Sequence, residues 1–196
     1  MNYRDCLENG VLILKTNSIL TANIDAEMLL CYSINKSREQ ILLNLDDTLK
    51  EKEINLFYAC INRRKYKEPV SSITGKRFFW NSHFKINKNV LTPRFETELL
   101  IEEVLKQHNN LKKIDILDIG LGSGCILISL LKERNKWRGT GIDISKKAIN
   151  TAKFNAKIQQ VDDRIKFINS DIDKFYFGKY DLIVSNPPYI DLVGYN

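Results

Sequence analysis

A proline pair near the end of the sequence suits chemistry at an NH₂ group, and it lies within the segment Asn186-Pro187-Pro188-Tyr189. Two consecutive prolines fix two φ angles and remove two backbone donors, so the Asn186 side chain and nearby carbonyls form a rigid row of acceptors. If the Asn186 side-chain oxygen and the Pro187 carbonyl hold both N–H bonds of an amide or aryl amine, its nitrogen can pyramidalise and attack a methyl group. Tyr189 offers a flat face to such a planar group. We therefore predict catalytic roles for Asn186, Pro187 and Tyr189, and substrate binding by all four residues.

A glycine-rich loop indicates a second ligand, of the nucleotide type. Gly120, Gly122 and Gly124 stand on alternate positions directly before a helical pattern. Glycines let the backbone approach a ligand closely, and a helix start presents free amide groups to an anion. The loop departs from the dinucleotide fingerprint G-x-G-x-x-G because Cys125 follows the third glycine. Asp118, just before the loop, would repel a pyrophosphate but could hold an ammonium group, which favours S-adenosyl-L-methionine as the cofactor.

Two further carboxylates extend the predicted cofactor site. Asp143 ends the second apolar run and can accept hydrogen bonds from both ribose hydroxyls. Asp171 ends the third run, where it can accept from the exocyclic amino group of adenine, and Ile172 follows it. The predicted cofactor contacts are Asp118, Gly120, Leu121, Gly122, Ser123, Gly124, Asp143, Asp171, Ile172 and Asn186.

Four apolar runs of strand length must position these residues. They cover residues 114–120, 139–144, 164–171 and 180–189. Helical patterns separate the first three runs, which predicts repeated βαβ units and a parallel sheet with the strand order 3-2-1-4. Ligands in such sheets bind beyond the carboxyl ends of the strands, where the motifs lie. A further helical pattern over residues 95–107 precedes the sheet, with an apolar stripe of Leu99, Leu100, Val104 and Leu105.

The first third of the sequence has a different pattern of apolar residues, which predicts a small helical bundle. Apolar positions recur there at helical spacing. The expected helices lie near residues 3–15, 23–33, 36–43 and 47–66. Aromatic residues between residues 69 and 92 suggest a hairpin or an extended linker. We therefore expect a bundle over residues 1–70, a hairpin or linker over 71–93 and an α/β domain over 94–196.

The composition is that of an ordinary globular protein. Its 196 residues are 43% hydrophobic and 28% charged, which excludes global disorder. The apolar runs are too short to span a membrane, and the N-terminus lacks the pattern of a signal peptide, so a cytosolic location is expected. The net charge of +6 comes from dispersed lysines and is weak support for a nucleic-acid partner. The four cysteines are isolated and only two histidines are present, so no metal site is expected.

Several motifs together resemble the HemK/PrmC family. They are IVSNPPYI, DIGLGSG, GIDIS and the segment from SSITGKRFFW to LTPRFETE. The family methylates the glutamine side-chain amide in the Gly-Gly-Gln loop of peptide chain release factors, and its front bundle helps to dock that substrate. The resemblance implies a Rossmann-like class I S-adenosylmethionine methyltransferase fold, with Thr92, Pro93, Arg94 and Glu98 beside the cofactor cleft. Phe95 stands where the family usually has a proline.

The resemblance also implies further strands beyond residue 196, so the sheet is expected to be incomplete on its C-terminal side. We expect a gene fragment or the front of a longer, fused enzyme, and a monomer. Two other functions remain open. The same motif occurs in enzymes that methylate the amino group of adenine in nucleic acids, with the aromatic residue stacked on a flipped base. The chain could also be a noncatalytic remnant that binds only a cofactor or a partner.

Overall fold

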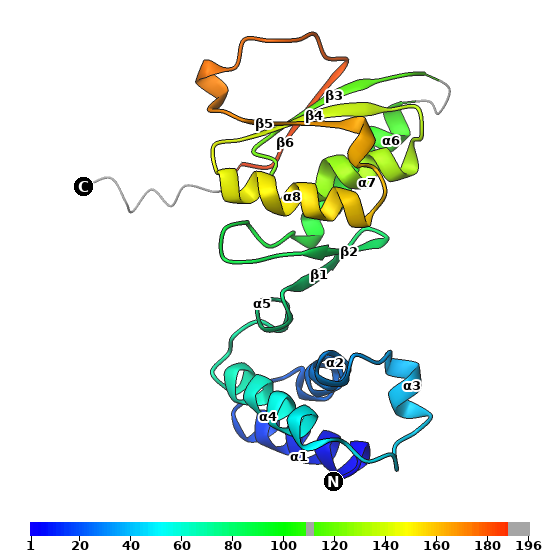
Figure 1. Ribbon diagram of the computed structural model, residues 1–196, viewed down its shortest axis with the longest axis vertical. Coiled ribbons are helices and arrows are strands. Elements are labelled where there is room, and N and C mark those ends of the chain that lie inside the picture. The colour runs from blue at the N-terminus through cyan, green and yellow to red at the C-terminus, as the bar shows by residue number, and fades with distance from the viewer. Residues whose placement is uncertain (109–111, 188–196) are drawn as a thin grey trace, which may run out of the picture. The chain divides into compact units, whose positions relative to one another are not determined.

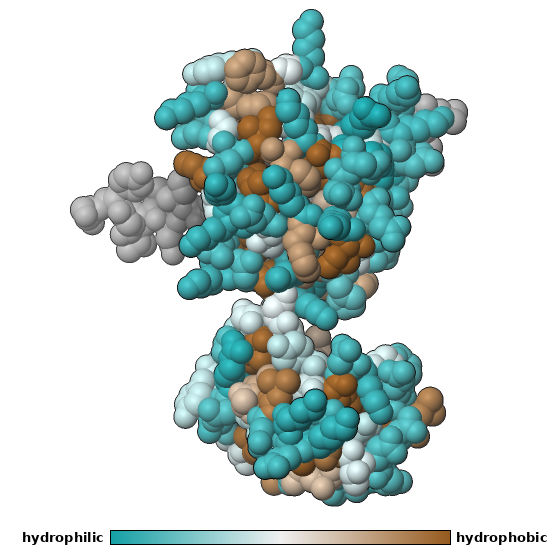
Figure 2. Space-filling view, viewed as in Figure 1, coloured by the Kyte–Doolittle hydropathy of each residue, from teal (hydrophilic) through white to brown (hydrophobic). Residues whose placement is uncertain are grey.

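The computed structural model of the protein describes residues 1–108 and 112–187. Its contacts divide the chain into two compact units, Met1–Gly75 and a second unit that begins at Lys76 (Figure 1). In the described ranges, no helix is both long enough and apolar enough to cross a membrane. In the view of Figure 2, the surface of each unit is mostly hydrophilic, and hydrophobic residues form small separate groups.

The first unit is a bundle of helices, as the helical spacing of its apolar residues predicted. Its helices are α1 (Tyr3–Thr16), α2 (Ala22–Ile34), α3 (Arg38–Leu42), α4 (Glu51–Lys65) and α5 (Val70–Thr74). Helix α1 begins with a capping box, in which the Asn2 side chain accepts a hydrogen bond from the Asp5 amide at 2.8 Å. Helices α1, α2 and α4 pack around fully buried side chains that include Leu14, Leu30 and Phe57. Removing these side chains from water stabilises the bundle.

Helix α4 begins later than the sequence predicted. It starts at Glu51 rather than near residue 47. The segment before it is extended instead, because Thr48 forms an antiparallel bridge with Asn2 at the start of the chain. A backbone that is paired in this way cannot at the same time form helical hydrogen bonds.

The second unit opens with a hairpin that follows helix α5. Helix α5 lies partly in the range where the sequence predicted a hairpin or linker, and it ends at Gly75, whose φ of 67° is left-handed. Strands β1 (Lys76–Phe79) and β2 (Ser82–Lys85) then pair antiparallel. Buried and exposed residues alternate along β2, which places its Phe84 side chain in the core of the second unit.

A parallel sheet of four strands forms the centre of the second unit. Its strands are β3 (Asp115–Ile119), β4 (Arg138–Asp143), β5 (Ile165–Asn169) and β6 (Leu182–Ser185). Their order, β5-β4-β3-β6, confirms the predicted order 3-2-1-4 and the α/β fold class. Because all four strands are parallel, their carboxyl ends meet at one edge of the sheet.

Helices pack against this sheet and connect its strands. They are α6 (Glu98–Gln107), α7 (Cys125–Glu133) and α8 (Lys146–Ile158), with the short 3₁₀ helices η1 (Phe95–Thr97), η2 (Asp162–Arg164) and η3 (Ile172–Lys174). Helix α8 contacts strands β4 and β5 of the sheet and strand β2 of the hairpin, and Figure 1 shows it between the two. Helix α8 is therefore one of the elements that join the hairpin to the sheet.

Helix α6 packs three of the four predicted apolar residues against the core. Its Ile101 and Val104 side chains are buried, whereas Leu99 is 62% exposed. Leu100 and Leu105 are partly buried against the core. The expected stripe is thus wrong at Leu99. Ile101 and Val104 are three residues apart and share one side of the helix, and that side meets the core.

Candidate functional site

A cavity of about 420 Å³ lies at the carboxyl ends of the strands. Six of the predicted site residues line it together, and they come from the glycine loop and from the ends of β4, β5 and β6. They are Gly120, Gly122, Asp143, Asp171, Ile172 and Asn186. The structure thus brings the expected cofactor residues and the asparagine of the proline segment to one place.

The glycine loop uses its backbone donors within the protein. The amides of Gly120 and Leu121 both donate to the Ile142 carbonyl, at 3.0 and 2.9 Å. The Gly122 amide donates to Asp143 Oδ2 at 2.8 Å, and the Gly124 amide donates to the Leu121 carbonyl at 2.8 Å. The amides of these four loop residues are therefore not free to bind an anion. The end of β4 binds the amides of Gly120, Leu121 and Gly122, and the loop itself binds that of Gly124.

Asp143 connects the loop to the start of α8. Its Oδ2 atom accepts from the Gly122 amide, and its Oδ1 atom accepts from the Ser145 amide at 2.8 Å. A carboxylate has about four acceptor positions, so each oxygen keeps a further lone pair for a ligand. Because the side chain also lines the cavity, it is held ready to accept hydrogen bonds from hydroxyl groups there.

The end of β5 is tied to the end of β4, which places Asp171 at the cavity. The Asn169 side chain donates to the carbonyls of Asp143 and Ile144 at 2.8 and 2.9 Å. Asp171 follows as the N-cap of η3, with its Oδ1 atom accepting from the Asp173 amide at 3.1 Å. The other carboxylate oxygen of Asp171 therefore stays available to a donor in the cavity.

Asp118 lies beneath the glycine loop and does not line the cavity. It is 1% exposed, and its Oδ2 atom has no hydrogen-bond partner within the described part of the chain. Burial raises the pKa of Asp118 to about 8; the Leu127 amide opposes this shift, and the nearby Asp143 carboxylate adds to it. The carboxyl group is therefore protonated at neutral pH, and a cation held at the loop would favour its ionised form.

Gly124 allows α7 and α8 to approach each other. Its φ is 79°, and a methyl group at this position would lie 2.8 Å from Ile128 Cδ1 and 3.2 Å from Ala152 Cβ. A side chain would thus be strained both by the backbone and by its neighbours.

We expect Gly124→Ala to lower the free energy of unfolding of the second unit by about 2 to 4 kcal/mol, from left-handed strain and overpacking together. Urea denaturation of the full chain measures the loss. Gly120→Ala is the control, because Gly120 has a similar φ of 73° but no atom within 4 Å of the added methyl group. An equal loss in both variants would contradict the role assigned to packing at Gly124.

The Asn186 side chain is oriented by a residue that lies 89 positions earlier in the chain. Its Nδ2 atom donates to Thr97 Oγ1 at 3.0 Å, and Thr97 is 8% exposed. The neighbouring Ser185 hydroxyl donates to the Ile119 carbonyl at 2.9 Å and fixes the end of β6 to β3. With its nitrogen held by Thr97, the amide keeps its Oδ1 acceptor for a ligand.

Comparisons with known proteins agree with this geometry. Residues 95–193 match the family model "Methyltransferase small domain", and residues 5–75 match "PrmC N-terminal domain". A release factor glutamine methyltransferase of Clostridium botulinum is 38% identical over 97% of this chain and 68% of its own length. The chain belongs to the release factor glutamine methyltransferase family. The resemblance to HemK/PrmC drawn from the motifs is thereby confirmed.

Other relatives in and around this family are longer than the chain. A release factor glutamine methyltransferase of Leptospira interrogans is 40% identical over 91% of this chain, which spans 64% of that relative. A bifunctional methyltransferase of Rickettsia bellii is 37% identical over 95% of this chain, which spans 38% of that relative.

Some residues that the family resemblance or the loop motif singled out do not line the cavity. Leu121, Ser123 and Gly124 are buried within the loop, and Pro187 is exposed outside the lining. Thr92, Pro93, Arg94 and Glu98 precede or start α6 and are not among the lining residues. Pro188 and Tyr189 lie outside the described residues. Of the loop residues predicted to contact the cofactor, Gly120 and Gly122 line the cavity, and their contacts with the cofactor stay a prediction.

Sequence reasoning missed a wall of the cavity that follows the hairpin. Asn89, Val90 and Leu91 line it, just before the segment that the family resemblance had placed there. The sequence signal that could have indicated this wall is the apolar pair of Val90 and Leu91 within a polar stretch. Thr97 was also missed, since its contact with Asn186 spans 89 residues of sequence.

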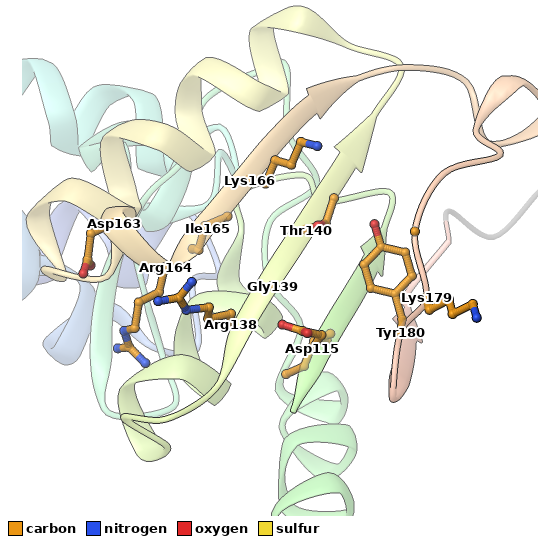
Figure 3. Close-up of a pocket in the computed structure, with 12 residues that line it drawn as sticks. Asp115, Arg138, Gly139, Thr140, Asp163, Arg164, Ile165, Lys166, Lys179 and Tyr180 are labelled. Atoms are coloured by element: carbon orange, nitrogen blue, oxygen red, sulfur yellow. The ribbon is translucent and has the colours of Figure 1, made fainter. Parts of the chain in front are cut away.

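A second cavity, of about 490 Å³, lies at the opposite ends of the strands (Figure 3). Arg138 and Thr140 from the start of β4 line it, with Lys166 from β5 and Tyr180 from the segment before β6. None of the predicted site residues lines this second cavity. Within residues 1–108 and 112–187, no group of three metal-ligating side chains is present either. The cavity at the carboxyl ends is therefore the candidate site.

Proposed function

We propose that the protein methylates the side-chain amide nitrogen of the glutamine in the Gly-Gly-Gln motif of peptide chain release factors, in the cytoplasm. Membership of the family supports this reaction. The observation that carries it is the Asn186 amide, which lines the cavity beside the glycine loop and is held by the buried Thr97 hydroxyl. An acceptor fixed in this way suits a substrate that presents an NH₂ group.

S-adenosyl-L-methionine is the proposed cofactor, and the polar groups of the site fit it better than a nucleotide phosphate. The amides of Gly120, Leu121 and Gly122 are already hydrogen-bonded and are not offered to an anion. Asp143 has acceptor positions left for ribose hydroxyls, and Asp171 has one for an amino group. When bound, the cofactor supplies a methyl group carried on positively charged sulfur, which the acidic lining favours.

The buried Asp118 carboxyl adds a further observation that favours a positively charged ligand. Its Oδ2 atom has no hydrogen-bond partner within the described residues, and burial raises its pKa to about 8. An amino-acid ammonium group bound at the loop would lower this pKa. We assign Asp118 an electrostatic role beneath the loop, in place of the direct contact expected from the sequence.

Asn186 would act on the substrate nitrogen by orientation. The lone pair of an amide nitrogen is delocalised, so the nitrogen must leave the amide plane before it can form a bond to carbon. Asn186 Oδ1 and the Pro187 carbonyl are the proposed acceptors for its two N–H bonds. Such hydrogen bonds strengthen as positive charge develops on nitrogen, which lowers the barrier selectively in the transition state. Stacking on Tyr189 and a contact with Pro188 remain parts of this proposal.

Thr97 should therefore be a positioning residue for Asn186. We expect Thr97→Val to lower kcat about 10-fold, because an unpaired Asn186 nitrogen no longer fixes the direction of Oδ1. Thr97→Ser keeps the hydroxyl and should stay within about 3-fold of the wild type. Steady-state kinetics of both variants, together with their affinity for S-adenosylhomocysteine, separate orientation from cofactor binding. Equal kcat values for the valine and serine variants would contradict this role.

The proposed function is tested by transfer of a labelled methyl group to a release factor. The chain is incubated with labelled S-adenosyl-L-methionine and either the release factor or a variant with its Gly-Gly-Gln glutamine replaced. Label should enter the first protein and not the second. Label in DNA or RNA but not in the release factor would favour methylation of adenine. Cofactor binding without any transfer would identify a noncatalytic chain.

A further inference from the structure

Helix α8 holds the hairpin through polar side chains on three successive turns. Thr151 Oγ1 accepts from Asn87 Nδ2 at 2.9 Å, Asn155 Oδ1 accepts from the Lys85 amide at 2.8 Å, and Gln159 Nε2 donates to the His83 carbonyl at 3.0 Å. The helical partners are four residues apart and the hairpin partners two apart. Four helical residues rise about 6.0 Å and two strand residues about 6.7 Å, so the two spacings match.

Asn155 differs from the other two residues because it also holds the glycine loop. Its Nδ2 atom donates to the Lys85 carbonyl at 3.0 Å and to the Ser123 carbonyl at 2.8 Å. With the bond from the Lys85 amide, the side chain makes three hydrogen bonds, and the residue is 1% exposed. The Lys85 amide must meet an oxygen and both carbonyls must meet a nitrogen, so the orientation of the Asn155 amide is fixed.

The two segments that Asn155 joins both lead to the cavity. Ser123 stands next to Gly122, which lines the cavity and bonds to Asp143. The chain that leaves Lys85 reaches the wall formed by residues 89–91. One buried side chain thus links the glycine loop to the segment that leads to that wall.

We propose that Asn155 is a positioning residue that holds the glycine loop and the 89–91 wall at the separation that the cofactor requires. This inference rests on the proposed placement of the cofactor in the cavity. Removal of the Asn155 amide deprives the Ser123 carbonyl and both backbone groups of Lys85 of a buried partner at once. The direct link between the glycine loop and the chain that leads to the wall is then lost.

The test compares Asn155→Leu with Gln159→Leu in the full chain. Gln159 belongs to the same row on α8 and contacts His83 and Lys132, but not the glycine loop. Hydrogen exchange of residues 120–124 and 85–91 and the affinity for S-adenosylhomocysteine are measured in both variants. Asn155→Leu should speed exchange in both segments and weaken binding about 10-fold or more. Gln159→Leu should speed exchange only near His83 and change the affinity less than about 2-fold.

Unchanged exchange at residues 120–124 in Asn155→Leu, or equal losses of affinity in both variants, would overturn the inference. If Asn155→Leu does not fold, Asn155→Ser replaces it, because a hydroxyl and a water molecule fit the same space. If the wild-type chain itself does not bind S-adenosylhomocysteine, the proposed cofactor site is wrong. The exchange measurement still decides whether Asn155 couples the two segments.

Discussion

Replacement of Asn186 with alanine is expected to lower the methyl-transfer rate about 100- to 1,000-fold, the usual cost of losing a preorganised hydrogen bond to a transition state. The affinity for the cofactor should stay nearly the same. Asn186 lines the cavity at the end of β6. The other predicted contacts of the cofactor come from the glycine loop and from the ends of β4 and β5. The loss should therefore fall on kcat for the release factor and much less on cofactor binding.

Ser185→Ala is the matched control for this experiment. Ser185 precedes Asn186 and bonds to the Ile119 carbonyl, so its loss removes a strand contact without removing the proposed acceptor. Single-turnover transfer and cofactor titration are measured for both variants. A parallel loss of transfer and of cofactor affinity in Asn186→Ala would show that Asn186 serves the cofactor rather than the substrate.

The second large effect is expected at Asp118, as a change in the pH dependence of cofactor binding. The pKa of its buried carboxyl group is about 8 in the ligand-free protein. A bound cation favours the carboxylate, so binding below pH 8 releases a proton. The wild-type affinity should therefore rise up to about 10-fold per pH unit between pH 6 and 8 and then level off. Asp118→Asn cannot ionise and should bind more weakly, with little dependence on pH.

The same carboxyl group affects stability, with a sign that can be worked out. Below pH 4 it is protonated in both the folded and the unfolded chain. Between pH 4 and 8 the unfolded chain loses the proton while the folded chain keeps it, so its contribution to stability falls as the pH rises. Without ligand at pH 8, Asp118→Asn should therefore melt several degrees above the wild type.

Isothermal titration in buffers of different ionisation enthalpy measures the released proton, and calorimetry measures the melting temperature. Asp115→Asn is the control, because Asp115 lies at the exposed start of the same strand. A wild-type affinity that does not change between pH 6 and 8 would contradict the coupling between Asp118 and the ligand.

The sequence was sufficient to predict the parallel sheet and the residues at the carboxyl ends of its strands. Apolar runs with the right spacing predicted β3 to β6, and the glycine loop, the strand ends and the proline segment supplied six of the fourteen residues that line the cavity. Parallel strands place such ends together whatever the details of packing. Local pattern alone was therefore enough to predict where the site lies.

The contacts that orient the site could not be read in this way. Thr97 and Asn155 are ordinary helix-start and helix residues in the sequence, and their partners lie 89 and 70 residues away. The motif could not show that the loop amides are already hydrogen-bonded within the protein. Their partners depend on where the end of β4 lies against the loop. Leu99 shows the same limit, because several helical faces were apolar and only packing decided which of them was buried.

The row of polar side chains on α8 has a consequence for association between molecules. Strand β2 pairs only with β1, so the backbone groups on its other side could recruit a strand from another chain. Asn155 pairs with both backbone groups of Lys85 as a neighbouring strand would, and Gln159 covers the His83 carbonyl. Helix α8 thus covers this edge of the hairpin, as folded proteins commonly cover strand edges that could pair with another chain.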